Sequence, residues 1–232
     1  MFPSHRGFRT FENMTHTMEF GGEHLQLHPW GALFWERQSL LLISDLHLGK
    51  ITHFRKYGAA VPLKALHRNF ARLDGLCETF TPKRICFLGD LFHSHMNREW
   101  ALFEAWARQC PCELELVVGN HDIISPLRYE ALGILCSESM EKGPFLLTHH
   151  PLDAFGGFNL SGHVHPAVRL KGPGRQQLRL PCFYVNGRQM ILPAFGAFTG
   201  SHVMEPQPGD RVYALADGQI IPLPEPVRTQ KP

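Results

Sequence analysis

The chain has 232 residues, a formal net charge of +2 and an apolar content of 44%. This length suits one sizeable α/β core, and the apolar content excludes wholesale disorder. No run of about 18 apolar residues is present, so we expect no membrane-spanning helix and no membrane partner. The polar N-terminus lacks the apolar block of a signal peptide, which favours a cytoplasmic location. The small net charge neither demands nor excludes a nucleic-acid partner.

The limits of the folded part follow from where strand-like patterns begin and end. Residues 1–17 have no clear periodicity, so we expect them to be disordered or to precede the true start. The candidate start residues are Met1, Met14 and Met18. Residues 18–222 are expected to form a single domain, and the Pro-rich residues 223–232 a loose tail.

Strands and helices alternate in the first half of the chain. Strands are expected at residues 25–27, 32–35, 40–43, 85–88 and 113–118, and helices at 63–76, 100–106 and 127–132. Apolar residues three and four apart define the first helix, and Pro62 suits its first turn. The run Leu40 to Ile43 is continuously apolar, as in a strand that is buried on both faces.

Short strands dominate the second half. We expect them at residues 145–148, 168–170, 178–180, 183–185, 190–192, 213–216 and 220–221. Asn186-Gly187 is typical of a two-residue hairpin turn. An alternating first half and a strand-rich second half together predict an α/β sandwich, in which two packed sheets are flanked by helices.

Oxygen and imidazole side chains follow five of the expected apolar runs. These side chains belong to Asp45, His47, Asp90, Asn120, His149, His163 and His165. Because ligands gather beyond the carboxyl ends of parallel strands, we expect the five strand ends to converge on one crevice. Mixed imidazole and carboxylate ligands suit transition metals, and two such ions roughly 3.5–4 Å apart can activate water and neutralise phosphoryl oxygens. The sequence therefore predicts a two-metal hydrolase of phosphodiesters.

The order of these blocks resembles the signature of calcineurin-like metallophosphoesterases. The matching segments are Asp45-Leu-His47, Gly89-Asp-Leu-Phe-His93, Gly119-Asn-His-Asp122, His149-His-Pro151 and Gly162-His-Val-His165. The resemblance implies an α/β fold that is a four-layer αββα sandwich of two mixed β-sheets flanked by helices. It also implies two divalent metal ions as cofactors, with Mn²⁺ as the first choice and Fe, Zn or Mg as alternatives.

The same resemblance implies a role for each site residue. The implied metal ligands are Asp45, His47 and His165 for one ion, Asp90 as the bridging carboxylate, and Asn120, His149 and His163 for the other. His121 resembles the histidine that contacts the scissile phosphate and protonates the leaving oxygen, and Asp122 would orient it. We choose His149 because the family pattern is His-x-Pro, and the adjacent His150 remains the alternative.

Several further residues are candidates for contacting substrate. Lys50 and Arg55 lie shortly after the first metal block, and His93 lies shortly after Asp90. We expect these three side chains to hold substrate phosphates. The alternative for Lys50 and Arg55 is that they are ordinary surface charges. The alternative for His93 is that it supports a metal ligand through a hydrogen bond. A group of basic residues follows His165 and could bind a DNA backbone, with an ordinary solvated hairpin as the alternative for each one; it comprises Arg169, Lys171, Arg175, Arg179 and Arg188.

A narrower likeness concerns the loops. Asp45 to Lys50, Phe54-Arg55, Asn159 to Pro166 and Leu192 to Gly200 are similar to segments of the bacterial ligase-associated DNA damage response endonucleases. The likeness runs from Met18 to about Tyr213 and implies DNA cleavage in repair, with DNA ligase and helicase-type proteins as partners. Two alternatives stay open: a phosphodiesterase of small or cyclic nucleotides, and a non-catalytic partner-binding module of a repair complex.

The six cysteines offer no recognisable framework. Only Cys110 and Cys112 are close in sequence, and no second Cys/His pair stands at zinc-ribbon spacing. We therefore expect reduced thiols that pack as small apolar groups.

Overall fold

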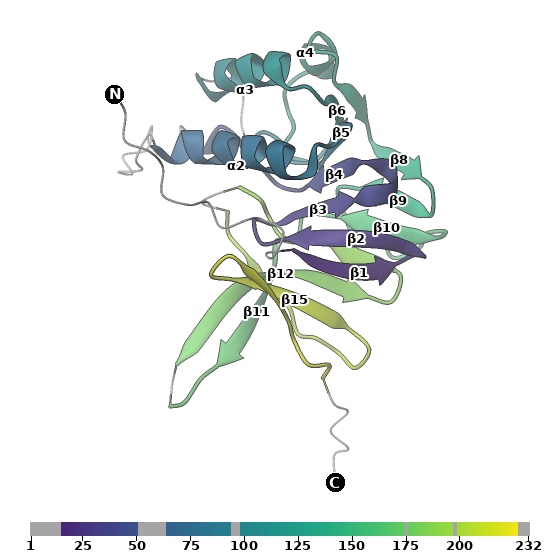
Figure 1. Ribbon diagram of the computed structural model, residues 1–232, viewed down its shortest axis with the longest axis vertical. Helices are drawn as coiled ribbons and strands as arrows, with labels where there is room; N and C mark the ends of the chain where they lie inside the picture. The colour runs from purple at the N-terminus through teal and green to yellow at the C-terminus, as the bar shows by residue number, and fades with distance from the viewer. Residues whose placement is uncertain (1–14, 51–63, 94–97, 175, 197–198, 227–232) are drawn as a thin grey trace.

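The computed structural model describes residues 15–50, 64–93, 98–174, 176–196 and 199–226. Within these residues, two large β-sheets lie face to face, and helices cover the outer side of the first sheet (Figure 1). No helix in the described part of the chain is long and apolar enough to cross a membrane. The expectation that residues 1–17 are disordered or precede the true start concerns mainly residues 1–14, which lie outside the described residues.

The first sheet follows the chain in order. Its strands are β1 (His16–Phe20), β2 (Glu23–His28), β3 (Ala32–Trp35), β4 (Leu40–Ile43), β5 (Arg84–Leu88), β6 (Glu113–Val117) and β7 (Leu135–Ser137). β1 to β4 are antiparallel, with the 3-10 turn η2 (Glu36–Gln38) before β4, whereas β4 to β7 are parallel. The parallel strands are joined through α2 (Lys64–Phe80), α3 (Arg98–Gln109) and α4 (Pro126–Glu130). Their carboxyl ends therefore meet at one edge.

The second sheet is built from the rest of the chain. Its strands are β8 (Ser139–Lys142), β9 (Phe145–Thr148), β10 (Phe158–Ser161), β11 (Pro166–Lys171), β12 (Gln177–Asn186), β13 (Gln189–Ile191), β14 (His202–Val203), β15 (Arg211–Ala216) and β16 (Gln219–Pro222). The order is β14-β11-β12-β13-β10-β9-β8, with β15 paired to β12 and β16. β9, β10 and β13 are parallel to one another, so this sheet is mixed as well.

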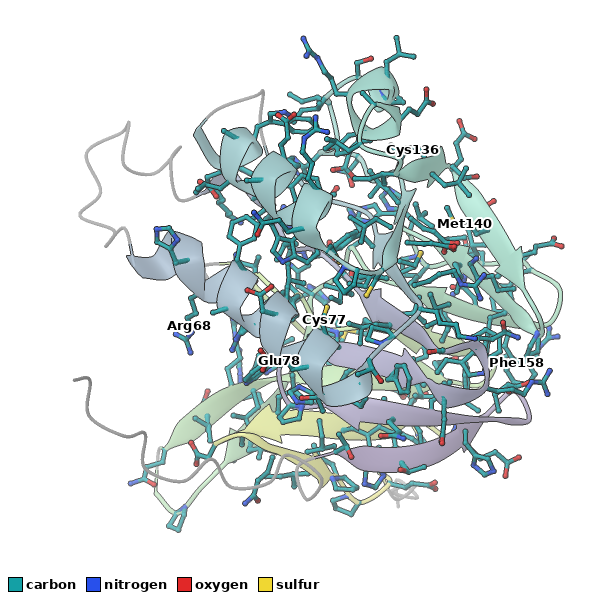
Figure 2. All side chains as sticks on the ribbon, turned by 45° about the horizontal axis from the view of Figure 1, so that its top comes forward. Arg68, Cys77, Glu78, Cys136, Met140 and Phe158 are labelled. Atoms are coloured by element: carbon teal, nitrogen blue, oxygen red, sulfur yellow. The ribbon has the colours of Figure 1, made fainter. Side chains whose placement is uncertain are left out.

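Three apolar clusters hold the layers together. The cluster between the sheets includes Leu42, Leu88 and Leu160, which belong to β4, β5 and β10. The cluster between the first sheet and the helices includes Phe87 and Phe103, while Arg68 projects from α2 into solvent (Figure 2). Burial of such large apolar side chains is the main favourable contribution to folding.

The third cluster lies on the outer face of the second sheet and corrects one expectation. It contains Val168, Cys182 and Val212, with Met204 and Leu223 packed against it. The αββα pattern predicts a helical layer on this side, but no α-helix occurs after Glu130 in the described residues. Loop and tail side chains bury this face instead. The α/β sandwich of two mixed sheets is confirmed.

Most expected elements are present, and the differences have local causes. The sheet begins at His16, two residues before the expected start of folded chain, because His16 pairs with Leu27. The two strands expected at 178–180 and 183–185 are one strand, β12, which runs through Pro181. β12 tolerates this proline because its partner changes there, from β11 up to Pro181 to β15 from Cys182.

Candidate metal centre

The predicted ligands converge where the parallel strands of the two sheets end. Asp45 and Asp90 follow β4 and β5, and backbone bonds join the loops: Asp45 N–H donates to Gly89 O at 3.2 Å, and His47 N–H to Asp90 O at 2.9 Å. From the second sheet, Gly162 N–H donates to His149 O at 3.0 Å, so the ends of β9 and β10 are joined too. The convergence expected from the strand ends is therefore present.

The first group of donors consists of Asp45, His47 and His165. The Nε2 atoms of His47 and His165 are 3.2 Å apart, and His165 Nε2 lies 3.2 Å from Asp45 Oδ1. Asp45 is fully buried and His47 nearly so, at 0% and 4% exposure. The three donor atoms could bind one ion together.

The second group consists of Asp90, Asn120, His149 and His163. His149 Nε2 lies at its centre, 3.0 Å from Asn120 Oδ1, 3.4 Å from Asp90 Oδ1 and 3.2 Å from His163 Nδ1. One imidazole nitrogen thus faces a carboxylate oxygen, an amide oxygen and a second imidazole. This is the mixed nitrogen and oxygen set that suits a divalent transition metal.

Asp90 stands between the two groups. Its Oδ2 is 3.8 Å from His47 Nε2, and its Oδ1 is 3.4 Å from His149 Nε2. The two oxygens of one carboxylate therefore face different donor groups. This is the position that the resemblance assigned to a bridging ligand.

The electrostatics of these donors fit a bound cation. Burial lowers the pKa of His47 to about 3, so the ring is neutral at physiological pH. Oδ1 of the fully buried Asp45 receives no hydrogen bond from the described residues. Lone pairs of buried nitrogen and oxygen atoms that point at one another repel unless a cation lies among them. The residues present therefore fit a metal site.

The backbone at the site is strained. Eight described non-glycine residues have positive φ, and five of them are predicted ligands: Asp45, His47, Asp90, His163 and His165. Each such residue costs on the order of 1–3 kcal/mol and persists only where its surroundings enforce it. Strain concentrated in this way is typical of functional sites.

Glycines allow the loops to approach this closely. A Cβ on Gly89, whose φ is +81°, would lie 2.1 Å from Nδ1 of His149. A Cβ on Gly119 would lie 2.3 Å from Oδ1 of Asp90. The glycines of the Gly-Asp and Gly-Asn pairs thus leave the space that the ligands occupy.

Hydrogen bonds from behind orient the ligands. His149 Nδ1–H donates to Leu88 O at 2.9 Å, which leaves Nε2 for the metal, and His165 Nδ1–H donates to Gly200 O at 3.1 Å. Asp45 Oδ2 accepts the backbone N–H of His163 at 2.9 Å and the hydroxyl of Ser44. Such partners fix the tautomer and direction of metal ligands.

The two adjacent histidines differ in burial, although His150 also lies close enough to His149 and His163 to share an ion with them. His149 is buried, at 2% exposure, and contacts both Asp90 and Asn120. His150 is exposed, and its ring packs beside that of His163 at 4.0 Å between centroids. His150 thus lies at the solvent edge of the second group.

The predicted catalytic residues lie beside the first group. The ring of His121 is 5.6 Å from that of His47 and 4.9 Å from that of His93, between centroids. His121 is partly exposed, and its backbone N–H donates to Asp90 Oδ1 at 2.9 Å. His121 and His93 therefore line the open side of the centre.

Asp122 is held by backbone hydrogen bonds from two neighbouring loops. Its carboxylate accepts the backbone N–H groups of Phe92 and Gly119, at 3.0 and 2.9 Å. Burial raises the pKa of Asp122 to about 6. Its described hydrogen bonds hold the loops that carry Asp90 and Asn120, and the orientation of the His121 ring by Asp122 stays a prediction.

The predicted substrate contacts differ in their placement. Lys50 is half-buried, and burial lowers its pKa below the ordinary lysine value although the nearby carboxylates of Asp90 and Asp45 oppose this by favouring its charge. Arg169 is exposed on β11, four residues after His165. Arg55 lies outside the described residues.

The sequence did not indicate the residues that hold the backbone of Ser44 and Asp45 through hydrogen bonds. Phe195 N–H donates to Ser44 O at 2.9 Å, and Gly196 N–H to Asp45 O at 3.1 Å. Arg72 on α2 in turn donates to Phe195 O at 3.3 Å. No local pattern marks such backbone contacts, although Phe195 and Gly196 fall within a segment that resembles the repair endonucleases.

Comparisons with known proteins agree with this fold. A sequence profile described as calcineurin-like phosphoesterase matches residues 39–184, which is more than half of the chain. The chain therefore belongs to the calcineurin-like phosphoesterase family, whose members are metal-dependent phosphoester hydrolases. No curated protein sequence matches the chain significantly.

Solved structures add detail. The structure is similar to that of Pseudomonas putida nuclease MPE, with a TM-score of 0.77 and 31% identity, covering 90% of this chain and 100% of that one. Yfce, a phosphoesterase from E. coli, matches with a TM-score of 0.41 and 17% identity, covering 78% of this chain and 96% of that one.

Proposed function

We propose that this phosphoesterase is a dinuclear-metal nuclease that hydrolyses phosphodiester bonds of DNA. The observation that carries the proposal is the shared Asp90, whose oxygens face His47 at 3.8 Å and His149 at 3.4 Å. The similarity to a nuclease over 90% of the chain supports a nucleic-acid substrate.

The two donor groups would hold the ions, for which we propose Mn²⁺. A pair of divalent cations supplies Lewis acidity that activates water near neutral pH and neutralises charge on the phosphoryl oxygens. Asp45 and Asp90 bring negative charge, whereas the amide of Asn120 is neutral and limits repulsion of an anionic substrate. The lowered pKa of His47 keeps this ligand neutral and its lone pair available.

His121 acts on the leaving group in this proposal. Its ring is partly exposed and forms a triangle with those of His47 and His93, with centroids 4.9–5.6 Å apart. From there, the imidazolium form of the ring can transfer a proton from Nδ1–H or Nε2–H to the leaving oxygen as the bond to phosphorus breaks, and the ring becomes neutral imidazole. Lys50 adds a positive charge beside the two carboxylates, where a substrate phosphate would enter.

A basic face on the β11–β12 hairpin supports DNA as the substrate. Arg169 and Arg179 are directly opposite each other in the register, and both are exposed. Lys171 is exposed on the same side of β11. Like charges directly opposite across two strands destabilise a sheet, so the pair is best explained by an anionic partner. We call Arg169, Lys171 and Arg179 the basic hairpin face.

The basic hairpin face is connected to the metal centre. Arg179 donates to Ser201 O at 3.4 Å, and the neighbouring carbonyl, Gly200 O, accepts the bond from His165 Nδ1–H at 3.1 Å. The hairpin itself projects from the body of the sandwich (Figure 1). A duplex or single strand at the metals would have its flanking phosphates within reach of this face.

The test is a matrix of metals and substrates with the purified full chain. Plasmid DNA, linear single strands, a cyclic nucleotide and a chromogenic small diester are each offered with Mn²⁺, Mg²⁺, Zn²⁺ and Fe²⁺. We expect DNA cleavage, highest with Mn²⁺, and binding that weakens steeply as salt rises. Turnover of the cyclic nucleotide without cleavage of DNA would overturn the nuclease assignment, and no hydrolysis with any metal would favour a non-catalytic binding module.

The biological setting is part of the proposal. The likeness of the loops to ligase-associated endonucleases suggests DNA repair in the cytoplasm, together with DNA ligase and helicase-type proteins. Co-purification of the tagged chain with such proteins, dependent on DNA damage and resistant to nuclease treatment, is the result expected.

A further inference from the structure

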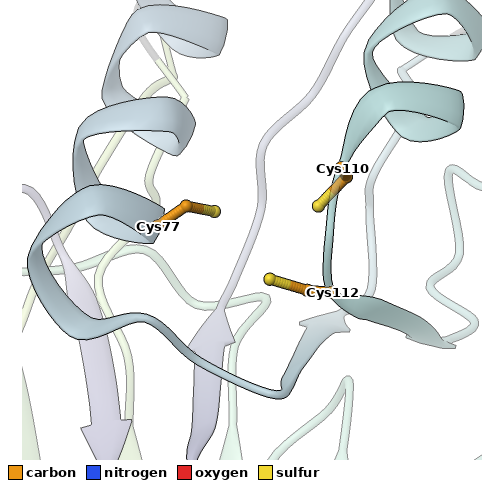
Figure 3. Close-up of side chains that lie close together, drawn as sticks. All are labelled: Cys77, Cys110 and Cys112. Atoms are coloured by element: carbon orange, nitrogen blue, oxygen red, sulfur yellow. The ribbon is translucent and has the colours of Figure 1, made fainter.

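Three cysteines meet far from the metal centre. Cys77 lies near the end of α2, Cys110 follows the last residue of α3, and Cys112 precedes the first residue of β6. Their Sγ atoms all lie within 4.8 Å of one another, and the three side chains point toward a common centre (Figure 3). The cluster is at the amino end of β6, whereas the candidate metal centre lies beyond its carboxyl end.

We propose that Cys77, Cys110 and Cys112 form a three-thiolate binding site for a soft or borderline metal cation, and that the bound cation is Zn²⁺. Thiolates are the ligands that soft and borderline cations prefer. Zinc–sulfur bonds of about 2.3 Å place neighbouring sulfurs of a tetrahedral site roughly 3.8 Å apart, so small adjustments within the observed 4.8 Å limit suffice.

The geometry favours a cation over a disulfide. A disulfide joins two sulfurs at about 2.05 Å and would leave the third thiol unused. All six cysteines are free in the structure. Three thiolates in contact repel one another, so they can all be ionised only with a positive ion among them.

The surroundings of the cluster allow an ion to enter. Cys77 and Cys110 are half-buried, and Cys112 is 8% exposed. A surface depression of about 430 Å³, whose lining includes Ala107, Arg108, Cys110 and Cys112, opens beside the sulfurs. Three protein ligands leave one position of a tetrahedral zinc site for water from this depression.

The bound ion would join three elements at one point. Before metal binding, the Cys112 thiol donates to Pro82 O at 3.1 Å, in the segment that links α2 to β5. On metal binding the thiol proton is released to solvent, the bond to Pro82 O is lost, and the thiolate sulfur binds the cation. The ends of α2 and α3 are then tied to the start of β6, which opposes their separation on unfolding.

Cobalt titration of the reduced full chain tests the proposal. Thiolate-to-cobalt charge transfer gives a strong near-ultraviolet band, and none of the described donors of the candidate metal centre is a thiolate. We expect this band in the wild-type chain, its loss in Cys110→Ser and Cys77→Ser, and its retention in Cys136→Ser. Cys136 is also half-buried but lies outside the cluster, so it is a matched control.

Zinc content and melting temperature complete the test. We expect one more equivalent of Zn²⁺ per wild-type chain than per Cys110→Ser chain, and a Zn²⁺-dependent rise in melting temperature that Cys110→Ser lacks. Circular dichroism of each variant checks that it folds. An unchanged cobalt band in both cluster variants would overturn the site. So would the absence of the band in the reduced wild-type chain, or the formation of a Cys77–Cys110 disulfide in the presence of Zn²⁺.

Discussion

The Nε2 atoms of His47 and His165 lie 3.2 Å apart, although 118 positions separate the two residues in the chain. His47 comes from the end of the first sheet and His165 from the second, so this contact joins the two sheets at their shared edge. Because burial keeps His47 neutral, its ring brings no positive charge to balance the carboxylate of Asp45. A cation bound here would therefore stabilise the contact between the sheets, in addition to its proposed role in hydrolysis.

Replacing the shared carboxylate should disable both donor groups. We expect Asp90→Asn to lose measurable hydrolysis of every diester and at least one of the bound ions, because the amide removes a negative charge that faces His47 and His149. Metal content by mass spectrometry and turnover are measured together. Asp153→Asn, at an exposed aspartate, is the matched control and should behave as wild type. Full metal content with normal turnover in Asp90→Asn would contradict the shared role.

Removal of the proposed acid should separate chemistry from metal binding. We expect His121→Ala to keep its metals but to lower kcat by roughly 10²–10⁴, since general acid catalysis contributes about that much. The loss should shrink for a diester whose leaving group is already a good one, because it needs no proton. An equal loss on good and poor leaving groups would remove His121 from this role. His93→Ala, at the neighbouring ring, is the comparison: if the dependence of the loss in kcat on the leaving group belongs to His121, this variant should not show it.

Sequence patterns predicted the parts of the molecule that follow from local rules. β4 and β9 have the expected bounds because each is a short apolar run that ends at a polar ligand. The five ligand blocks could be recognised because their order along the chain is visible in the sequence, whatever the distances between them in the fold. The structure adds that Asp90 faces both groups, which spacing along the chain cannot show.

Contacts between distant segments were out of reach of the sequence. Cys77 was not grouped with Cys110, because the packing of α2 beside α3 brings them together and no spacing rule records it. The pairing of Arg169 with Arg179 depends on the register of β11 and β12, which a one-residue slip would change. The continuation of β12 through Pro181 likewise depends on a change of partner strand.

Neutralising the basic hairpin face should weaken DNA binding and leave the chemistry intact. We expect Arg169→Ala with Arg179→Ala to reduce affinity for DNA and to lower the slope of log affinity against log salt by about 1 for each phosphate that the variant no longer binds. Turnover of a small diester should be unchanged, because neither side chain belongs to the donor groups. Arg37→Ala, at an arginine that pairs with Glu23 at 3.1 Å away from the hairpin, is the control. An unaltered salt slope in the double variant would exclude this face.

Acid should destabilise the metal-free chain through His47. Burial lowers the pKa of His47 from 6.5 to about 3 in the folded state, so the unfolded chain binds a proton that the folded chain does not. The contribution of the neutral His47 ring to the free energy of unfolding is fully present above pH 6.5, and it is lost as the pH falls from 6.5 toward about 3. Urea unfolding of the chelator-treated chain should show this slope, on the order of a few kcal/mol across the window. His47→Gln should flatten it, and His24→Gln, at an exposed histidine, should not.

The space beside His149 should tolerate no methyl group. A Cβ at Gly89 would lie 2.1 Å from His149 Nδ1, the atom that donates to Leu88 O. We expect Gly89→Ala to displace the His149 ring, release metal from the second group and abolish hydrolysis. Gly22→Ala is a matched control, since Gly22 has a similar φ of +74° but no atom within 4 Å of the added Cβ. Both variants carry the cost of an alanine at positive φ, so the difference between them in metal content isolates the clash. If Gly89→Ala bound metal as well as Gly22→Ala does, the position of His149 in the second group would be wrong.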